Sequence, residues 1–332
     1  MEKKSIWKKI TASREASLLI ILVVLCILIQ TQSSSFLTAK NILDMLKNNA
    51  VIMIMALGML CVLLIGGIDI SIMSTAALSG MSVGLLLKYN VISSTPLLFG
   101  IAILIGMLCG LLVGIIISKG KVLPIIATMG FMYIFRGLAY VISNNQWASA
   151  ENLGDFKNFA LEKYLGFGVL NNVIAVTIVC YIIFFVVMKW TRVGRRIYAV
   201  GSNAEAAEIS GINVTRVKLG VYTVMGILAG LGGALAVSVY GSAQPNMLYG
   251  DEMDVIAACV IGGISMNGGR GSVGGAFLGA LILAIIAKAL PLVGINPLAQ
   301  NTIKGVIILV VIIINVVTQR AMDKNNLKAR EM

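Results

Sequence analysis

The chain has 332 residues, of which 58% are hydrophobic and 12% are charged, and its mean hydropathy is +0.96. Because about a quarter of the residues of a soluble domain are charged, this composition excludes a soluble globular protein and predicts an integral membrane protein with several spans. The net charge of +12 is explained by Lys and Arg in cytoplasmic loops rather than by nucleic-acid binding. The sequence contains no histidine, which excludes an imidazole base, ligand or proton relay.

Ten apolar stretches are candidates for membrane-spanning helices, because a helix needs about 20 mostly apolar residues to cross a bilayer. In chain order they lie near residues 16–32, 44–66, 70–88, 95–117, 122–143, 169–188, 219–239, 253–265, 272–290 and 300–318. The stretch at 253–265 is short, so the count stays open between eight and ten. The runs are continuous rather than alternating, which argues against a membrane β-barrel.

We therefore predict an all-α polytopic membrane protein of about ten transmembrane helices, with one transmembrane domain over residues 1–332. This count places both termini on the side where Lys and Arg gather, which is the cytoplasmic side. The cytoplasmic parts are then the N-terminal segment 1–15, the loop 189–218 and the tail 319–332. No small-residue cleavage site follows the basic N-terminus, so we expect an uncleaved first span. An arrangement as two inverted five-helix repeats stays open.

Glycines four residues apart predict helix faces that allow close backbone approach inside a membrane. Such faces are formed by Gly106, Gly110 and Gly114, by Gly226 and Gly230, and by Gly271, Gly275 and Gly279. The five cysteines lie far apart inside apolar runs. We therefore expect neither a disulfide framework nor a metal site.

The loop 189–218 carries six Lys or Arg against two Glu and contains its own helix signal. Ser202 or Asn203 can cap a short helix, Glu205 falls in its first turn, and Gly211 suits the left-handed residue that ends it. The predicted helix at 204–210 is too short to be stable alone and must pack on something. Two interpretations stay open: a basic loop that holds the spans in register, and a docking helix that carries force from a cytoplasmic partner.

The spacing Glu205-Ala206-Ala207-x3-Gly211 matches the loop signature of permease subunits in ATP-driven importers. Further runs extend the match over nearly the whole chain: Gly66-Gly67-Ile68-Asp69-Ile70-Ser71, Ala199-Val200-Gly201-Ser202-Asn203, Ser210-Gly211-Ile212-Asn213-Val214, Ser242-Ala243-Gln244-Pro245, Ile261-Gly262-Gly263 and Gly268-Gly269-Arg270-Gly271. In these motifs the chain resembles the ribose-type sugar permeases, which are membrane subunits of ABC importers for ribose and related simple sugars. One departure is Ile72-Met73-Ser74, where the family more often has Val-Gly-Ser, and this puts the local helix packing in doubt.

The resemblance implies a permease dimer, with a homodimer expected, in a bacterial plasma membrane. It also implies two cytoplasmic ATPase subunits that carry ATP and Mg²⁺, and an external sugar-binding protein. No catalytic residue, cofactor or metal site is expected in this chain. The resemblance favours the docking helix, whose coupling residues would be Ala204, Glu205, Ala206, Ala207, Glu208, Ser210 and Gly211. The identity of the sugar does not follow from it.

Two sequence patterns bear on nucleotide binding. The run Gly269-Arg270-Gly271-Ser272-Val273-Gly274 formally matches GxGxxG, but an apolar stretch of helical length precedes it instead of a strand. We therefore expect close helix packing there and not a dinucleotide site. No GxxxxGK[ST] sequence occurs in the chain, so any ATP-driven motion must originate in another polypeptide.

Four polar residues are candidates for a translocation path: Arg136, Asn144, Gln244 and Asp254. Arg136 lies well inside the stretch 122–143, where a charge costs about 2.5–3.5 kcal/mol and usually faces the bundle interior or a wet cavity. Pairing with a backbone carbonyl, or a dimer contact, is the alternative for this residue. The other three belong to a polar group expected on the outer side, which a solvated loop or a docking surface for a binding protein explains equally well. Asp69, with Ser71, is expected to cap the following helix.

Two other classes of function are the alternatives. An ion-coupled secondary transporter of a small polar solute usually places ionisable residues at mid-membrane, whereas Arg136 is the one deep charge in this sequence and no carboxylate joins it. Uptake that persists without ATP, on an ion gradient alone, would support that class. An intramembrane enzyme is disfavoured, because the sequence has no histidine, no paired deep carboxylates and no metal-ligand spacing.

Overall fold

The computed structural model describes residues 14–163, 170–296, 299–300, 302–306, 309–310 and 313. These residues form helices, turns and short connections with no strand among them, and one isolated β-bridge joins Ala148 to Ala243. The helices are α2 (Arg14–Gln32), α3 (Ala39–Leu64), α4 (Ile72–Lys88), α5 (Thr95–Ser118), α6 (Pro124–Ser143), the 3-10 helix η1 (Gly154–Ala160), α7 (Asn172–Trp190), α8 (Arg192–Ser202), α9 (Ala204–Ile209), α10 (Val214–Tyr240), α11 (Asp251–Ile261) and α12 (Val273–Leu292). The predicted all-α class is confirmed over these ranges.

Seven of the described helices are long and apolar enough to cross a membrane: α2, α3, α5, α6, α7, α10 and α12. Helix α4 is apolar but has 17 residues. Helix α11 has 11 residues, which is about 16 Å of helix against a hydrocarbon core of about 30 Å. The predicted stretch at 300–318 lies largely outside the described residues. A polytopic membrane protein is thus confirmed, whereas the ten spans and the inverted repeats stay predictions.

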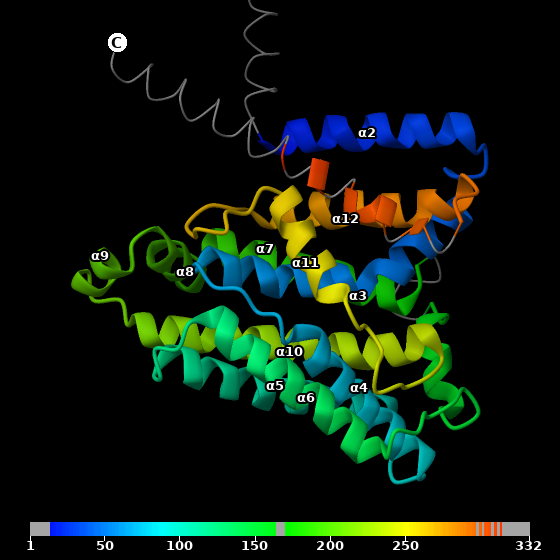
Figure 1. The fold of residues 1–332 in the computed structure, drawn as a ribbon, viewed down its shortest axis with the longest axis horizontal. Helices are drawn as coiled ribbons and strands as arrows, with labels where there is room; N and C mark the ends of the chain where they lie inside the picture. The colour runs from blue at the N-terminus through cyan, green and yellow to red at the C-terminus, as the bar shows by residue number, and fades with distance from the viewer. Residues whose placement is uncertain are drawn as a thin grey trace, which may run out of the picture.

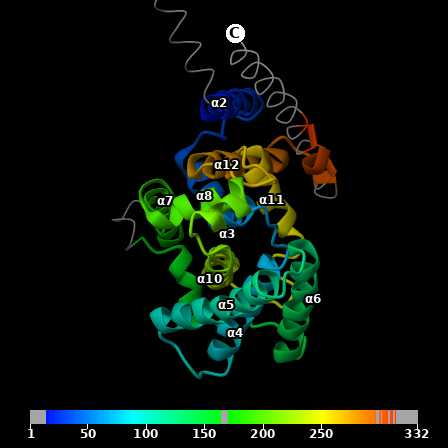
Figure 2. The same cartoon turned by 90° about the vertical axis from the view of Figure 1, so that its left-hand side faces the viewer.

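The long helices lie side by side along one direction, which we take as the membrane normal (Figure 1). The most apolar parts of α3 and α10 are each 72% buried, whereas that of α2, which lies on the outside against α12, is 11% buried. Seen end-on, α3 lies between α12 and α10, and α5, α4 and α6 lie beyond α10 (Figure 2). Helices α8 and α9 protrude from one end of this bundle.

Glycine faces set the closest helix contacts, as the sequence predicted. Gly106 and Gly110 of α5 meet Gly226 and Gly230 of α10 so closely that a Cβ on any of the four would collide with backbone atoms of the other helix. Gly275 and Gly279 of α12 approach the backbone of Gly262 and Ala258 in the same way. Gly271, predicted to continue that face, precedes α12 and lies against Ile264 instead. These contacts tie α5 to α10 and α11 to α12 as closely packed pairs.

Candidate functional site

The short helix predicted at 204–210 is present as α9, which spans Ala204–Ile209. At its N-terminus, the side chain of Asn203 accepts a hydrogen bond from the N–H of Ala206 at 2.9 Å, so Asn203 rather than Ser202 is the cap. At its C-terminus, Gly211 adopts a left-handed φ of +80°. The N–H groups of Gly211 and Ile212 donate to the carbonyls of the last turn at 2.9 and 3.0 Å, the two bonds of a Schellman motif. Both ends of α9 are therefore closed by local hydrogen bonds.

Helix α9 presents most of its surface to solvent. Ala207 is its one buried side chain, at 4% exposure, so Glu205 and Ile209 point away from the protein on the opposite side. Ile209 is 89% exposed, and burying such a side chain contributes about 1.5–3 kcal/mol. Sequence reasoning did not include Ile209 among the docking residues. Ile209 lies four residues after Glu205, on the face opposite Ala207.

Helix α8 joins α9 to the membrane helix α7. The Thr191 hydroxyl accepts hydrogen bonds from the N–H groups of Val193 and Gly194, at 3.2 and 3.4 Å, and so starts α8 directly after α7 ends. Gly194 packs on the backbone of Met188, where a Cβ would collide. The apolar face of α8 is buried, and its three arginines, Arg192, Arg195 and Arg196, are exposed. This helix is therefore an arm fixed to α7 and carrying α9 at its far end.

The C-terminal end of α8 contacts two other parts of the bundle through Gly66, Gly201, Gly268 and Gly269, which we call the glycine junction. The N–H of Gly269 donates to the carbonyl of Leu64, the last residue of α3, at 2.9 Å. A Cβ on Gly201 would collide with that same carbonyl oxygen. The Tyr198 hydroxyl of α8 donates to the carbonyl of Gly271 at 2.8 Å. A displacement of α8 must therefore act on the end of α3 and on the α11–α12 connection. Of the glycines in the GxGxxG match, Gly269 belongs to this junction and Gly271 packs on Ile264, whereas Gly274 lies in neither contact.

The α3–α4 connection, which starts at the glycine junction, holds a buried carboxylate. Asp69 is 3% exposed, and its Oδ1 accepts hydrogen bonds from the N–H and the hydroxyl of Ser71 at 2.9 and 2.6 Å. These bonds fix the turn before α4, but Ser71 is the N-cap residue and no side chain accepts a hydrogen bond from the first turn of α4, so the expected cap is not formed. Burial raises the pKa of the Asp69 carboxyl to about 6, although the two bonds from Ser71 act in the opposite direction. The buried hydroxyl of Tyr222 lies against Gly67 of the same connection and has no hydrogen-bond partner within the described structure.

Arg136 of α6 is 9% exposed and pairs with backbone carbonyls. Its Nη1 donates to the carbonyls of Pro245 and Met247 at 2.9 and 2.8 Å, and its guanidinium lies 5.7 Å from the centre of the Tyr249 ring. The carboxylates of α11 add favourable electrostatics. Of the interpretations left open by the sequence, pairing with backbone carbonyls is the one the structure shows. Arg136 fastens α6 to the α10–α11 connection.

The three other path candidates lie around the same connection. Asn144 ends α6 in a left-handed conformation and is exposed. The turn after Asn144 leads to Ala148, which forms a β-bridge with Ala243, the residue before Gln244. The Gln244 side-chain amide donates a hydrogen bond to the Ser242 hydroxyl at 3.1 Å. Asp254 of α11 forms an ion pair with Lys304. Of the four candidates, Arg136 contacts the α10–α11 connection directly, Gln244 belongs to that connection, Asp254 lies in the first turn of α11 that follows it, and Asn144 ends α6.

The acidic residues at the start of helix α11, which the sequence expects on the outer side, are partly buried. Gly250, with φ +90°, turns the chain into α11, and Asp251, Glu252 and Asp254 fill the first turn, where carboxylates are favoured. The other end of α11 leads into the glycine junction, so the acidic first turn lies at the end of α11 away from that junction. With 11 residues, α11 is too short to cross a bilayer alone, and interrupted helices are places where transporters form solute sites.

Residues 41–315 match the family described as branched-chain amino acid transport system / permease component. Among curated proteins, the chain is 36% identical over 304 residues to the ribose import permease protein of Escherichia coli (strain K12), which covers 91% of this chain and 93% of the relative. It is 38% identical over 301 residues to the ribose import permease protein of Bacillus subtilis (strain 168), with coverages of 89% and 90%. It is 33% identical over 326 residues to the galactose/methyl galactoside import permease protein of Escherichia coli (strain K12), with coverages of 93% and 95%. No solved structure matches the chain.

Proposed function

The chain belongs to the permease family of the branched-chain amino acid transport system and is a ribose-type simple-sugar ABC permease, and from this premise we propose how it works. It is the membrane-spanning subunit of a bacterial importer that moves ribose or a related simple sugar into the cell. An external binding protein delivers the sugar, and a separate subunit that binds ATP and Mg²⁺ hydrolyses ATP. No bond of the sugar is broken in this chain.

One observation carries this proposal: the identity to import permeases for ribose and for galactosides extends over about nine tenths of the chain and of each relative. A shared fold alone would leave the function open. Here the similarity includes the segments that form α9, the glycine junction and the α10–α11 connection. Ribose is the first sugar to test, because the ribose relatives share 36% and 38% of their residues with this chain against 33% for the galactoside relative.

The coupling element is α9, which docks in a cleft of the ATPase subunit on the cytoplasmic side. Its exposed face offers the apolar side chain of Ile209 beside the carboxylate of Glu205, a combination suited to a pocket with a basic rim. The closed caps of α9 support this role, because a helix of six residues keeps its shape alone only poorly. The arginines of α8 act mainly as topology anchors.

Movement of α9 reaches the membrane through α8 and the glycine junction. The bond from Gly269 to the Leu64 carbonyl joins the α11–α12 connection to the end of α3, and Gly201 of α8 lies against that carbonyl. The bond from Tyr198 to the Gly271 carbonyl joins α8 to the residues that precede α12. Closure of the ATPase subunits would therefore tilt α3 and the α11–α12 pair against the α5–α10 pair. Such rocking opens the bundle to alternate sides of the membrane.

The sugar path runs along α6 and the α10–α11 connection, past Arg136, Asn144, Gln244 and Asp254. Two copies of the chain, packed as a homodimer, enclose this passage between them. The amide of Gln244 and the carboxylates at the start of α11 offer the hydrogen-bond partners that sugar hydroxyls need. Arg136 holds the connection that presents them.

The test is uptake of labelled ribose by proteoliposomes that contain the chain together with the ATPase and binding protein encoded beside its gene. Uptake should require ATP inside and binding protein outside. Glu205→Lys, Ile209→Asp and Gly211→Pro should each reduce uptake at least about tenfold while the protein still inserts, because α9 lies outside the spans. Lys119→Gln, on the exposed α5–α6 connection, is the control. Normal uptake by the Gly211→Pro variant would contradict the docking role, and uptake on an ion gradient without ATP would contradict the class.

A further inference from the structure

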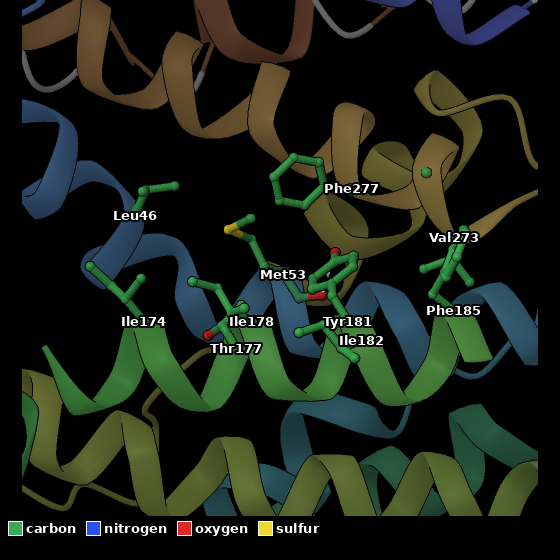
Figure 3. Close-up of a pocket in the computed structure, with 11 residues that line it drawn as sticks. Leu46, Met53, Ile174, Thr177, Ile178, Tyr181, Ile182, Phe185, Val273 and Phe277 are labelled. Carbon is green, nitrogen blue, oxygen red and sulfur yellow. Dashed lines mark hydrogen bonds between the residues drawn. The ribbon is translucent and has the colours of Figure 1, made fainter. Parts of the chain in front are cut away.

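An apolar groove of about 470 Å³ opens on the membrane-facing surface between α7, α12 and α3. Figure 3 shows Phe277 of α12 above Tyr181 of α7, with Met53 of α3 behind them. Its lining is formed by Leu46, Met53, Ile174, Thr177, Ile178, Tyr181, Ile182, Phe185, Val273, Gly274 and Phe277. The groove lies apart from the α10–α11 connection where the path candidates gather.

The two polar side chains in this lining already have their hydrogen bonds. The Thr177 hydroxyl donates to the carbonyl of Val173 at 2.8 Å, and the Tyr181 hydroxyl donates to the carbonyl of Met53 at 2.9 Å. The Tyr181 ring meets Phe277 edge-on, with ring centres 5.2 Å apart. A sugar in this groove would lose its hydrogen bonds to water and gain few in return. The groove therefore suits a hydrocarbon chain.

A second hollow of about 580 Å³ continues the groove toward α8 and ends in polar groups. The two hollows share Phe185, Val273, Gly274 and Phe277. Beyond these residues the second one reaches Glu15 of α2, Lys189 of α7, Tyr198 of α8 and Ser272 at the start of α12. The combined groove is thus apolar along most of its length and charged at the end near α8.

Its dimensions fit one leaflet of a bilayer. From Ile174 to Phe185 the groove follows α7 for roughly 16 Å, which is about half of the ~30 Å hydrocarbon core. Lys189 lies one helical turn beyond Phe185, and the exposed Trp190 follows it. Trp side chains are enriched at the membrane–water interface. The charged end therefore lies at the level of the lipid headgroups.

The charges at this end are of opposite sign. The Lys189 ammonium lies 5.1 Å from the ring centre of Phe185 and 5.4 Å from that of Trp190. A carboxylate oxygen of Glu15 accepts a hydrogen bond from the Ser272 hydroxyl at 2.7 Å. A phosphate suits Lys189, whereas Glu15 repels a purely anionic headgroup and attracts an ammonium that can donate hydrogen bonds.

We propose that this groove binds a phospholipid whose headgroup carries a phosphate and a primary ammonium, as in phosphatidylethanolamine. One acyl chain occupies the groove between α7 and α12, the phosphate contacts Lys189, and the ammonium donates to Glu15. The lipid connects α2, α7 and α12, which meet there beside the start of α8. The site is independent of which solute the protein carries.

The experiment is native mass spectrometry of the full-length protein, purified in detergent and incubated with equal amounts of phosphatidylethanolamine, phosphatidylglycerol and phosphatidylcholine with the same acyl chains. We expect phosphatidylethanolamine to be retained at least about fivefold over phosphatidylglycerol, the effect of one favourable charge contact, and also over phosphatidylcholine, whose quaternary ammonium has no N–H to donate to Glu15. Gly274→Leu should abolish this retention. A Cβ at Gly274 meets its nearest atom, a carboxylate oxygen of Glu15, at 3.5 Å, so the variant folds while its side chain enters the groove. Gly100→Leu, with nothing within 4 Å of its Cβ, is the matched control.

A second pair of variants tests the headgroup. Glu15→Gln should remove the preference for phosphatidylethanolamine over phosphatidylglycerol, and Glu151→Gln, at another exposed carboxylate, should keep it. Equal lipid retention by wild type and Gly274→Leu would overturn the proposal, as would equal binding of the three lipids. A covalent dimer formed by a bismaleimide through Ile178→Cys, and not in wild type, would assign the groove to a second copy of the chain and also overturn it.

Discussion

At membrane depth, the Arg136 guanidinium exchanges water for two carbonyl oxygens, those of Pro245 and Met247, at 2.9 and 2.8 Å. Hydrogen bonds from a charged donor are worth about 1.5–3 kcal/mol each, more than bonds between neutral groups. Carbonyls that lose such a donor inside a membrane stay unsatisfied, which adds to the cost. The position of the α10–α11 connection therefore depends on this side chain.

We predict that Arg136→Met destabilises the protein by on the order of 3 kcal/mol, since both carbonyls lose their donor. Arg136→Lys keeps the charge but cannot reproduce the planar guanidinium, so its stability should fall between that of wild type and that of Arg136→Met. Thermal unfolding in detergent measures the loss. If Arg136→Met has the melting temperature of wild type and is impaired only in uptake, then Arg136 acts in the translocation path and does not hold the α10–α11 connection in place.

Asp69 gives stability a pH dependence. Its pKa is about 6 in the fold and about 3.9 in an unfolded chain, so the folded state favours the protonated form. The protonated Asp69 carboxyl therefore contributes to the free energy of unfolding below about pH 4, and this contribution is lost as the pH rises through about 6. Asp69→Asn keeps an oxygen that can accept from Ser71 and cannot ionise. The variant should therefore gain on the order of 2 kcal/mol over wild type between pH 4 and pH 7.5. Parallel pH profiles of the two melting temperatures would contradict this.

Elements whose signals are local could be predicted from the sequence. Helix α9 was found because Asn203 and Gly211 act on backbone groups within a few residues. The glycine faces of α5 and α10 were found because their period is that of a helix. Their partners could not be found, since the contact between Gly106 and Gly226 joins residues far apart in the chain. The same reason hid the partners of Arg136, which lie more than a hundred residues away.

Helix α11 differs in its bounds from the apolar stretch predicted for it. The apolar stretch at 253–265 predicted a span, and the structure has an 11-residue helix that begins earlier, at Asp251. The helix starts there because Gly250 turns the chain with a positive φ and because carboxylates are favoured in a first turn. It ends at Gly262, which fits against Gly275 of α12 without a Cβ. Hydropathy reports neither event, so the bounds of α11 had to come from the structure.

The glycine junction should transmit force between α8, α3 and the α11–α12 connection, and Gly201 is its most constrained member. Gly201→Ala places a Cβ against the Leu64 carbonyl and should cost about 1–3 kcal/mol through overpacking. We predict that the variant inserts and supports ATP hydrolysis while uptake falls at least about tenfold. Gly220→Ala, where a Cβ meets nothing within 4 Å, is the control and should be neutral or slightly stabilising. If Gly201→Ala keeps the uptake rate and the melting temperature of wild type, then the glycine junction accommodates the extra Cβ and does not transmit force.

For the molecule as a whole, the glycine contacts define two closely packed helix pairs, which we expect to move as units. Helices α5 and α10 are in backbone contact along a turn or more, as are α11 and α12. Interdigitated backbones of this kind have discrete packings rather than a continuous range of positions. The glycine junction connects α8 to one of these units and to α3. A short stroke at α9 can therefore become a rigid-body rotation at the far side of the membrane.

This movement requires α9 to face the cytoplasm. The side of the membrane on which each loop lies also decides whether the 17-residue α4 is a span. We predict that, in a variant without the five native cysteines, a membrane-impermeant maleimide labels Trp147→Cys in intact cells but neither Glu208→Cys nor Lys8→Cys. Inverted vesicles should give the reverse, and all three should react in detergent. Between positions 147 and 208, α7 is the one described helix long enough to cross, so labelling of both from one side would contradict the orientation of α9.

Between positions 8 and 147 lie α2, α3, α4, α5 and α6. Labelling of position 8 together with position 147 would therefore mean that α4 does not cross and that the ten-span count is wrong.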